Sequence, residues 1–530
     1  MSDLEEPPIG PIALSLSGGG FRAAGFHVGV MTALQRVGLL GNVRVLSTAS
    51  GGSLVGARWL LGVARNEPFE ETQYKLCRFL LETRALPMAV RRAAKERLTL
   101  TQGFAEVLED TLFDDSRFSS ATLREILESR IFIEEGSFNA TVCDTGLPFR
   151  FTFSRGSSAK IGNQNCYLPR KDAQHLRLSD IVAASAAFPG VFEPMVVPND
   201  FTFPDVELAA TASESFSGGH QGLVDGGVYD NQGISAMLLA AKRFDSAPGD
   251  EAIDLYLVSD AERKLPPPVA RVPRKKRRWI PMLRIWHVSA LSLLSILGAG
   301  ASIYLVWRKV LAERAIHDFR WPNDAIAFGV PIGMLAVFVL GILYVRHVVS
   351  KALRPIKGHV GNKAWRALKR MRVRDAVEAL QTRAKTLGGV AAFSFPQRVR
   401  SLVYQSVWGN SQLKGRRVAC HIYELQQESF QHVDGLYDPK PPLLQCVKRA
   451  ARLPTGLELS APDELDDLQV TGQATTIANL IEYLEGTFGR VRSQWPLEVL
   501  ELDGLLREDW EALNSSGKPL RPRELDSRGR

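Results

Sequence analysis

Apolar residues follow two patterns in turn along the first half of the chain. Short apolar runs, which are typical of buried strands, occur at residues 12–18, 43–50, 149–154 and 252–260. Apolar residues recur with helical spacing at residues 28–38, 53–64 and 233–244. Alternation of this kind predicts an α/β domain with a mostly parallel sheet. We place this domain at residues 12–265, after a short leader at residues 1–11.

Two longer apolar runs follow that domain. Residues 285–307 and 325–345 contain no side chain that could carry a charge except His287. Each run is long enough to cross a hydrocarbon core of about 30 Å as a helix. The pattern therefore predicts a two-helix transmembrane hairpin over residues 285–345. Two buried helices of a large soluble core are the alternative, but core helices are seldom apolar on every face.

Positive charge is concentrated beside these runs. The chain carries a formal charge of +8, and residues 266–284, a proline-rich basic linker, include seven Lys and Arg and no acid between positions 271 and 284. The rest of the chain is nearly neutral, which argues against a nucleic-acid-binding surface. Further basic residues follow the second run, so the positive-inside rule predicts an integral membrane protein whose N- and C-terminal parts are cytoplasmic. No secretory signal opens the sequence, because its first residues are acidic and contain proline.

Residues 346–530 show mixed helix and strand signals. We expect part of this cytoplasmic segment to pack on the catalytic domain, because residues 402–425 are too few for an independent core. Residues 362–388 predict a cationic helix. A helix that lies on the membrane surface and an ordinary helix that packs through an apolar stripe are equally good interpretations of it. The polar C-terminal tail is expected to be disordered.

Cofactor and metal motifs are not found in the sequence. The five cysteines lie far apart and form no CxxC or Cys/His cluster, and no carboxylate cluster has metal-site spacing. We therefore expect reduced thiols, no metal and no cofactor.

A glycine-rich stretch, SGGGFRAAG at residues 17–25, follows the first predicted strand. Backbone N–H groups at such a strand–helix junction favour an anion. A P-loop would need a following Lys-Ser or Lys-Thr pair, and the dinucleotide fingerprint would need glycine, or less commonly alanine, where Ala23 stands. A nucleotide site is thus a weak alternative.

A second motif, TASGG at residues 48–52, predicts a strand, a tight turn at Ser50 and a helix beginning at Gly51 and Gly52. Such an elbow lifts a serine hydroxyl out of a sheet. Thr48 stands where the G-x-S-x-G form has its first glycine. The alternative is an ordinary strand end.

A serine nucleophile needs a base, and none of the nine histidines is an obvious candidate. Asp225, in the sequence GLVDGG, could serve, because its flanking glycines allow a close backbone approach. A D-G-G sequence alone is usually only a turn.

Taken in this order, the glycine stretch, the Ser50 elbow and Asp225-Gly-Gly resemble the patatin-like phospholipases. Residues 138–146 and 181–190 resemble further segments of that family, and the resemblance covers residues 12–260. It implies a patatin-like three-layer fold with a Ser–Asp dyad. Ser50 would form the acyl-enzyme and Asp225 would act as the base. The predicted oxyanion hole consists of the backbone N–H groups of Gly18, Gly19, Gly20, Phe21 and Arg22. The Arg22 side chain fits either a structural ion pair or a lipid phosphate.

These observations predict a membrane-anchored serine lipid acyl hydrolase of the phospholipase A or lysophospholipase type. Its substrates would be phospholipids or other lipid esters of the bilayer. The same dyad could also transfer the acyl group to an alcohol other than water. Two other interpretations stand beside it. One is a catalytically inactive patatin-like membrane scaffold or lipid-binding protein, and the other is a nucleotide-binding membrane protein.

Overall fold

The computed structural model describes residues 8–114, 120–129, 131–154, 161–247, 251–262, 395–426 and 439–523, with isolated positions between 297 and 340. The chain forms two compact units, one from residues 1–266 with 395–530 and the other from residues 267–394. The first unit contains the sheet and all the predicted site residues.

The sheet has a parallel part and an antiparallel extension. The parallel strands lie in the order β10 (Arg417–His421), β9 (Leu255–Asp260), β1 (Ile12–Leu16), β2 (Val43–Ala49) and β3 (Glu135–Val142). The antiparallel strands are β4 (Pro148–Ser154), β5 (Ile161–Gly162), β6 (Tyr167–Leu168), β7 (Met195–Val197) and β8 (Gln221–Asp225). The predicted α/β fold with a mostly parallel sheet is thus confirmed, and its antiparallel extension begins at β3.

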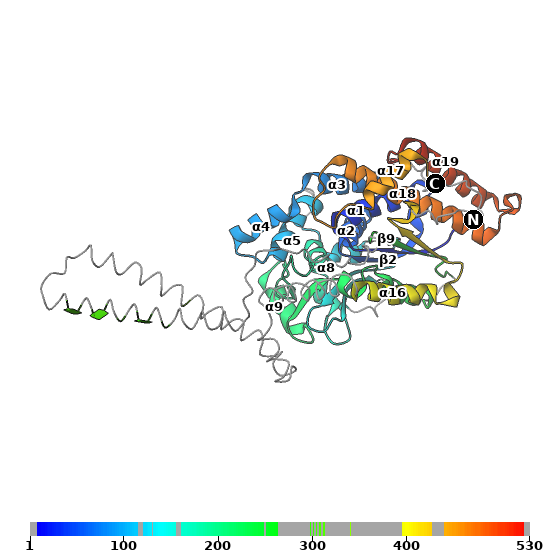
Figure 1. Ribbon diagram of the computed structural model, residues 1–530. Helices are drawn as coiled ribbons and strands as arrows, with labels where there is room; N and C mark the ends of the chain where they lie inside the picture. Colours follow the sequence, from blue (N-terminus) through cyan, green and yellow to red (C-terminus); the bar gives the residue numbers. More distant parts are fainter. Residues whose placement is uncertain are drawn as a thin grey trace, which may run out of the picture. The chain divides into compact units, whose positions relative to one another are not determined.

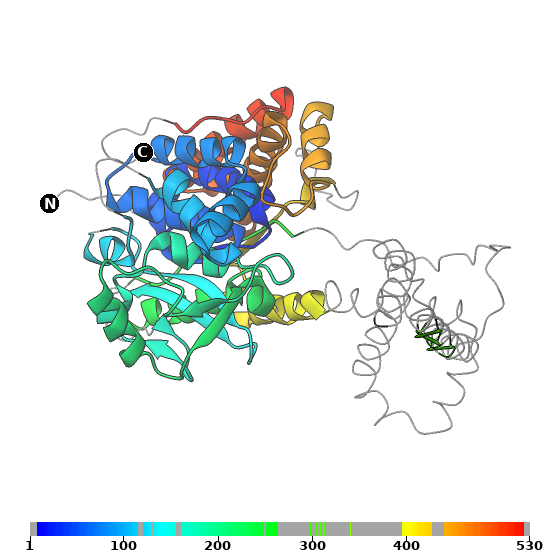
Figure 2. The same ribbon diagram turned by 90° about the vertical axis from the view of Figure 1, so that its left-hand side faces the viewer.

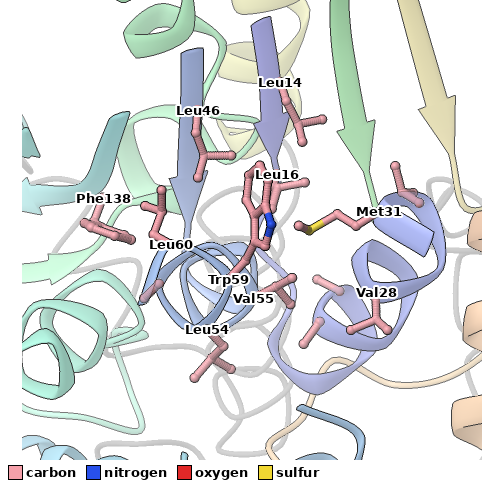
Figure 3. Close-up of a cluster of buried hydrophobic side chains, with 14 of the residues drawn as sticks. Leu14, Leu16, Val28, Met31, Leu46, Leu54, Val55, Trp59, Leu60 and Phe138 are labelled. Carbon is pink, nitrogen blue, oxygen red and sulfur yellow. The ribbon is translucent and has the colours of Figure 1, made fainter. Parts of the chain in front are cut away.

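Helices cover both faces of the sheet and make three layers (Figure 1). Successive strand residues point to opposite faces, so Leu14 and Leu16 of β1 pack toward α1 (Gly20–Arg36) and α2 (Gly51–Ala64). Figure 3 shows this apolar cluster, with Trp59 of α2 and Met31 of α1 between the strands and the two helices. On the other face, Ala13 joins a second cluster with α11 (Ile234–Asp245) and α16 (Phe395–Trp408).

The remaining helices surround these layers. They are α3 (Phe69–Glu82), α4 (Ala85–Glu96), α5 (Leu100–Leu108), α6 (Leu123–Glu128), α7 (Arg170–Ala173), α8 (Leu178–Ser185), α9 (Val206–Ser215), α10 (Gly227–Asp230), α17 (Pro441–Ala450), α18 (Pro462–Phe488) and α19 (Leu497–Ser516).

The long helix α18 lies directly against α1, as both ribbon views show (Figures 1 and 2). Their backbones touch: a side chain at Gly29 of α1 would overlap the carbonyl of Gln469, and one at Gly472 of α18 would overlap the carbonyl of Phe26. Glycine at both positions permits this close approach. The C-terminal part of the chain is therefore built into the same core as the glycine-rich stretch.

The predicted hairpin at residues 285–345, the basic linker, the cationic helix at 362–388 and the end of the tail lie almost entirely outside the described residues. Leu297, Tyr304, Trp307 and Leu311 are described, and these four residues are helical and exposed. Within the described part of the chain, no helix is both long enough and apolar enough to span a membrane.

Candidate active site

Ser50 occupies a strained turn between β2 and α2. Its backbone has φ 47° and ψ −117°, a conformation that non-glycine residues rarely adopt. The turn is closely packed, since a side chain at Gly51 would overlap the carbonyl of Gly20 and one at Gly52 would overlap the carbonyl of Leu16. Ser50 is 8% exposed, so its hydroxyl lies at the edge of the core. This is the elbow that the TASGG sequence predicts.

Strand β3 brings Asp225 to Ser50. Strand β2 pairs with β3 as far as Ala49 opposite Asn139, and Ser50 follows. From the next residue of β3, strand β8 takes the place of β2, with Asp225 opposite Ala140. The other side of β3 is occupied by β4, so β2 and β8 lie on the same side. The end of β2 and the end of β8 therefore meet.

The Ser50 side chain lies beside the Asp225 carboxyl group and lowers the pKa of that group. Asp225 is buried and accepts a 2.7 Å hydrogen bond from the Gly227 N–H. Burial raises the pKa of Asp225 to about 6, although Ser50 and Gly227 lower it in part. A carboxylate with this pKa is ionised at neutral pH and is basic enough to accept a proton.

A network of hydroxyl groups holds the elbow from below. The Ser50 N–H donates to the Ser185 hydroxyl oxygen at 3.1 Å, and that hydroxyl donates to the carbonyl of Asn139 at 2.6 Å. The Asn139 side-chain amide donates to the Thr48 carbonyl at 2.8 Å. Asn139 and Ser185 lie in the two additional segments that resemble the family, but their contacts were not predictable from the sequence.

Thr48, the departure from the G-x-S-x-G form, is part of this network. Its hydroxyl lies 2.9 Å from that of Ser53 and 3.3 Å from the Ser137 carbonyl. Its methyl group faces Gly56 of α2, where a side chain would come too close. The threonine therefore fits the elbow because α2 has a glycine opposite it.

The glycine-rich stretch lies against the elbow, and two of its predicted donors are already used. The Gly18 N–H donates to the Asn231 carbonyl at 2.8 Å, and the Phe21 N–H donates to the Gly456 carbonyl at 2.8 Å. The N–H groups of Gly19 and Gly20 have no hydrogen-bond partner among the described residues. An oxyanion can use these two donors.

Gly51 supplies a further candidate donor. It is the first residue of α2, and the first N–H groups of a helix have no acceptor within the helix. Because its backbone touches that of Gly20, the start of α2 lies directly against the glycine-rich stretch. This role for Gly51 had no signal in the sequence beyond its place in the elbow.

The Arg22 side chain forms a hydrogen bond within the protein. It is 3% exposed and donates to the Leu453 carbonyl at 3.1 Å. Leu453 and Gly456 belong to the connection between α17 and α18, which thus contacts the glycine-rich stretch at two points. Nothing in the sequence near residue 453 indicated a place at the site.

His27 serves a structural role beside the site. Its Nε2 lies 2.8 Å from the Ser17 carbonyl and its Nδ1 2.7 Å from the Ser259 hydroxyl. Burial lowers the pKa of His27 to about 4, so the ring is neutral and joins β1 to β9. Elsewhere, no group of three or more His, Cys, Asp or Glu side chains in the described ranges could hold a metal ion.

Comparison with protein families shows a similarity over part of the chain. Residues 14–238 match the model of the patatin-like phospholipases. This region contains the glycine-rich stretch, Ser50 and Asp225. The match supports a lipid acyl hydrolase of the patatin-like class. No curated protein matches the chain.

Solved structures with partial similarity include human GIVD cytosolic phospholipase A2, at 16% identity and a TM-score of 0.30 over 48% of this chain and 45% of that one. The same enzyme in complex with methyl gamma-linolenyl fluorophosphonate and terbium chloride matches at 17% identity and a TM-score of 0.29, over 48% and 41%. VipD from Legionella pneumophila matches at 13% identity and a TM-score of 0.23, over 58% and 56%. The chain thus spans about half the length of these proteins.

Proposed function

We propose that this protein is a membrane-anchored lipid acyl hydrolase that uses Ser50 as nucleophile and Asp225 as base. The observation that carries the proposal is the placing of the Ser50 side chain, in a strained turn, beside the buried Asp225 carboxylate. The N–H groups of Gly19 and Gly20, which have no partner among the described residues, lie next to this turn. Nucleophile, base and donors are the three parts that acyl transfer needs.

In the first half of the reaction, the Ser50 oxygen attacks the ester carbonyl carbon while Asp225 accepts the hydroxyl proton. The negative charge that forms on the carbonyl oxygen is stabilised by the N–H groups of Gly19, Gly20 and Gly51. Collapse of the tetrahedral intermediate breaks the ester C–O bond. Asp225 returns the proton to the departing alcohol, and the acyl group stays on Ser50.

In the second half, water replaces the alcohol. Asp225 takes a proton from the water as its oxygen attacks the acyl-enzyme, and the same N–H groups stabilise the second intermediate. Release of the carboxylic acid restores the Ser50 hydroxyl. An alcohol that takes the place of water would give transacylation by the same steps.

Anchoring is supported by the two long apolar runs at residues 285–345 and by the basic residues on both sides of them. The exposed apolar side chains of Leu297, Tyr304, Trp307 and Leu311 on helical backbone are consistent with burial in lipid. We propose that both termini are cytoplasmic and that the enzyme acts on esters of the cytoplasmic leaflet. Attachment would keep the enzyme at a high effective concentration near its substrate.

The dyad is tested with the detergent-purified full chain, a short-chain p-nitrophenyl ester and vesicles of mixed phospholipids. We expect hydrolysis by the wild type and its loss in Ser50→Ala and Asp225→Asn. Labelling by a fluorophosphonate probe should require Ser50. Ser179→Ala is the matched control, because Ser179 is a buried serine of α8 whose hydroxyl has no hydrogen-bond partner among the described residues.

The outcomes separate the alternatives. If the folded wild type shows no hydrolysis and is not labelled by the probe, the proposed enzymatic activity is overturned. That outcome would favour an inactive lipid-binding scaffold. Thermal stabilisation by a nucleotide would favour the nucleotide-binding interpretation. Extraction of the protein from membranes by alkaline carbonate, without detergent, would contradict the proposed anchor.

A further inference from the structure

Strand β10 leaves one edge of the sheet open. It pairs with β9 on one side, and no strand in the described part of the chain pairs with its other side. An open edge presents backbone donors and acceptors to any extended chain that comes beside it.

The direction of each backbone group in β10 follows from the ends of its ladder. The Tyr256 N–H donates to the Arg416 carbonyl at 2.7 Å, and the Ile422 N–H donates to the Asp260 carbonyl at 3.1 Å. Backbone N–H and carbonyl groups alternate in direction along a strand. Those of the even-numbered residues of β10 therefore point toward β9, and those of the odd-numbered residues point away from it. The His421 N–H follows this rule, since it donates to the Glu424 carboxylate instead. The N–H and carbonyl of Ala419 accordingly point to the open side.

A groove of about 530 Å³ runs along this open edge, and Arg417, Ala419 and His421 lie on its floor. Helix α16 forms one wall with Tyr404 and Trp408, and helix α18 forms the other. The two helices lie on opposite faces of the sheet (Figure 1). The space between them has the form of a slot for one more strand.

The walls of the groove differ in chemistry. The α16 wall is aromatic, whereas the α18 wall presents Asn479, Glu482 and Tyr483. Glu482 is exposed and has no ion-pair partner among the described residues. The guanidinium among the lining residues, that of Arg417, is held toward α16, because it donates to the carbonyls of Val407 and Trp408 at 2.7 and 2.8 Å. Glu424 also lines the groove, so the lining residues carry two carboxylates against one guanidinium.

We propose that this groove binds an extended basic segment of a partner protein, which adds to the sheet as a strand beside β10. The backbone of the segment would bond to the N–H and carbonyl groups of Ala419 and to the carbonyl of Arg417. Its side chains alternate, so apolar residues would face Tyr404 and Trp408 while Lys or Arg residues face Glu482. This inference does not depend on the catalytic proposal.

The test measures binding of a fluorescein-labelled peptide, KVKVKVK, to the purified full chain by fluorescence polarisation. The same peptide with N-methyl groups on alternate residues is the first control, because it keeps the charges but loses the N–H donors of one edge. We expect it to bind at least about tenfold more weakly, the equivalent of one or two net hydrogen bonds.

Protein variants locate the site. Ala419→Pro removes the outward N–H without taking a bond from the ladder, and Ala419→Val keeps that N–H as its matched control. We expect weaker binding to Ala419→Pro and to Glu482→Lys, and unchanged binding to Ala419→Val. Equal binding of the methylated and unmethylated peptides to the wild type would overturn strand addition, and this comparison needs no variant to fold. Failure of KVKVKVK to bind at all would also overturn it.

Discussion

The backbone N–H of Phe21 donates a 2.8 Å hydrogen bond to the carbonyl oxygen of Gly456. This bond joins the first turn of α1 to the connection between α17 and α18, two segments that lie at opposite ends of the chain. The neighbouring N–H groups of Gly19 and Gly20 have no partner among the residues that the structure describes. The C-terminal part of the chain therefore positions the proposed oxyanion hole.

We predict that Gly20→Ala lowers kcat/KM for a p-nitrophenyl ester by at least about 100-fold, the usual loss when an oxyanion donor is displaced. Gly20 has φ +61°, and an added side chain would overlap the Gly456 carbonyl. Gly456→Ala is the matched control, since a side chain there would meet no atom closer than 3.9 Å. It should retain activity. Wild-type activity in Gly20→Ala would show that this contact does not position the donors.

The activity should depend on the ionisation of Asp225. Its pKa is raised to about 6 by burial, and only the ionised carboxylate can accept the Ser50 proton. We expect kcat/KM to be level above about pH 7 and to fall about tenfold per pH unit well below pH 6. A profile measured from pH 4.5 to 8 checks this. A rate that stays level down to pH 5 would exclude Asp225 as the base.

The same carboxylate should cost stability at neutral pH. Its pKa is higher in the folded protein, at about 6, than the unfolded value of about 3.9, so ionisation opposes folding. The favourable contribution is fully present below the unfolded pKa and is lost as pH rises through 6, a change of about 3 kcal/mol in the free energy of unfolding.

Asp225→Asn should therefore have a higher free energy of unfolding than the wild type at pH 7.5, and this advantage should shrink toward pH 4.5. Urea unfolding at the two pH values measures the difference. Ser50→Ala serves as the control, because it changes the site but keeps the carboxylate. Equal destabilisation by Asp225→Asn at both pH values would contradict the assignment of the raised pKa to this residue.

Two buried serines of α8 make a matched pair. The Ser185 hydroxyl accepts from the Ser50 N–H and donates to Asn139, whereas the Ser179 hydroxyl has no partner among the described residues. We expect Ser185→Ala to lower the free energy of unfolding by about 1–3 kcal/mol and to reduce kcat, because it leaves the Ser50 N–H unsatisfied. Ser179→Ala should change neither quantity. Identical results for both variants, measured by urea unfolding and ester hydrolysis, would show that the network does not hold the elbow.

Local patterns in the sequence predicted much of this fold. The apolar runs at residues 12–18 and 43–50 are β1 and β2, and the helical spacing at residues 53–64 lies within α2. The turn at Ser50 was also predictable, because the glycines that follow it are a local requirement of the backbone. The antiparallel extension from β3 was not predicted, since strand order depends on pairing between distant segments.

By itself, the sequence determined the alternation of strands and helices and the local chemistry of Ser50 and Asp225, because these depend on neighbouring residues. Only the tertiary structure decided which donors of residues 18–22 stay free. Gly18 and Phe21 lose theirs to Asn231 and Gly456, acceptors that are far away in the sequence. A hydrogen-bond donor is occupied or free according to what the fold brings beside it, and no local pattern carries that information.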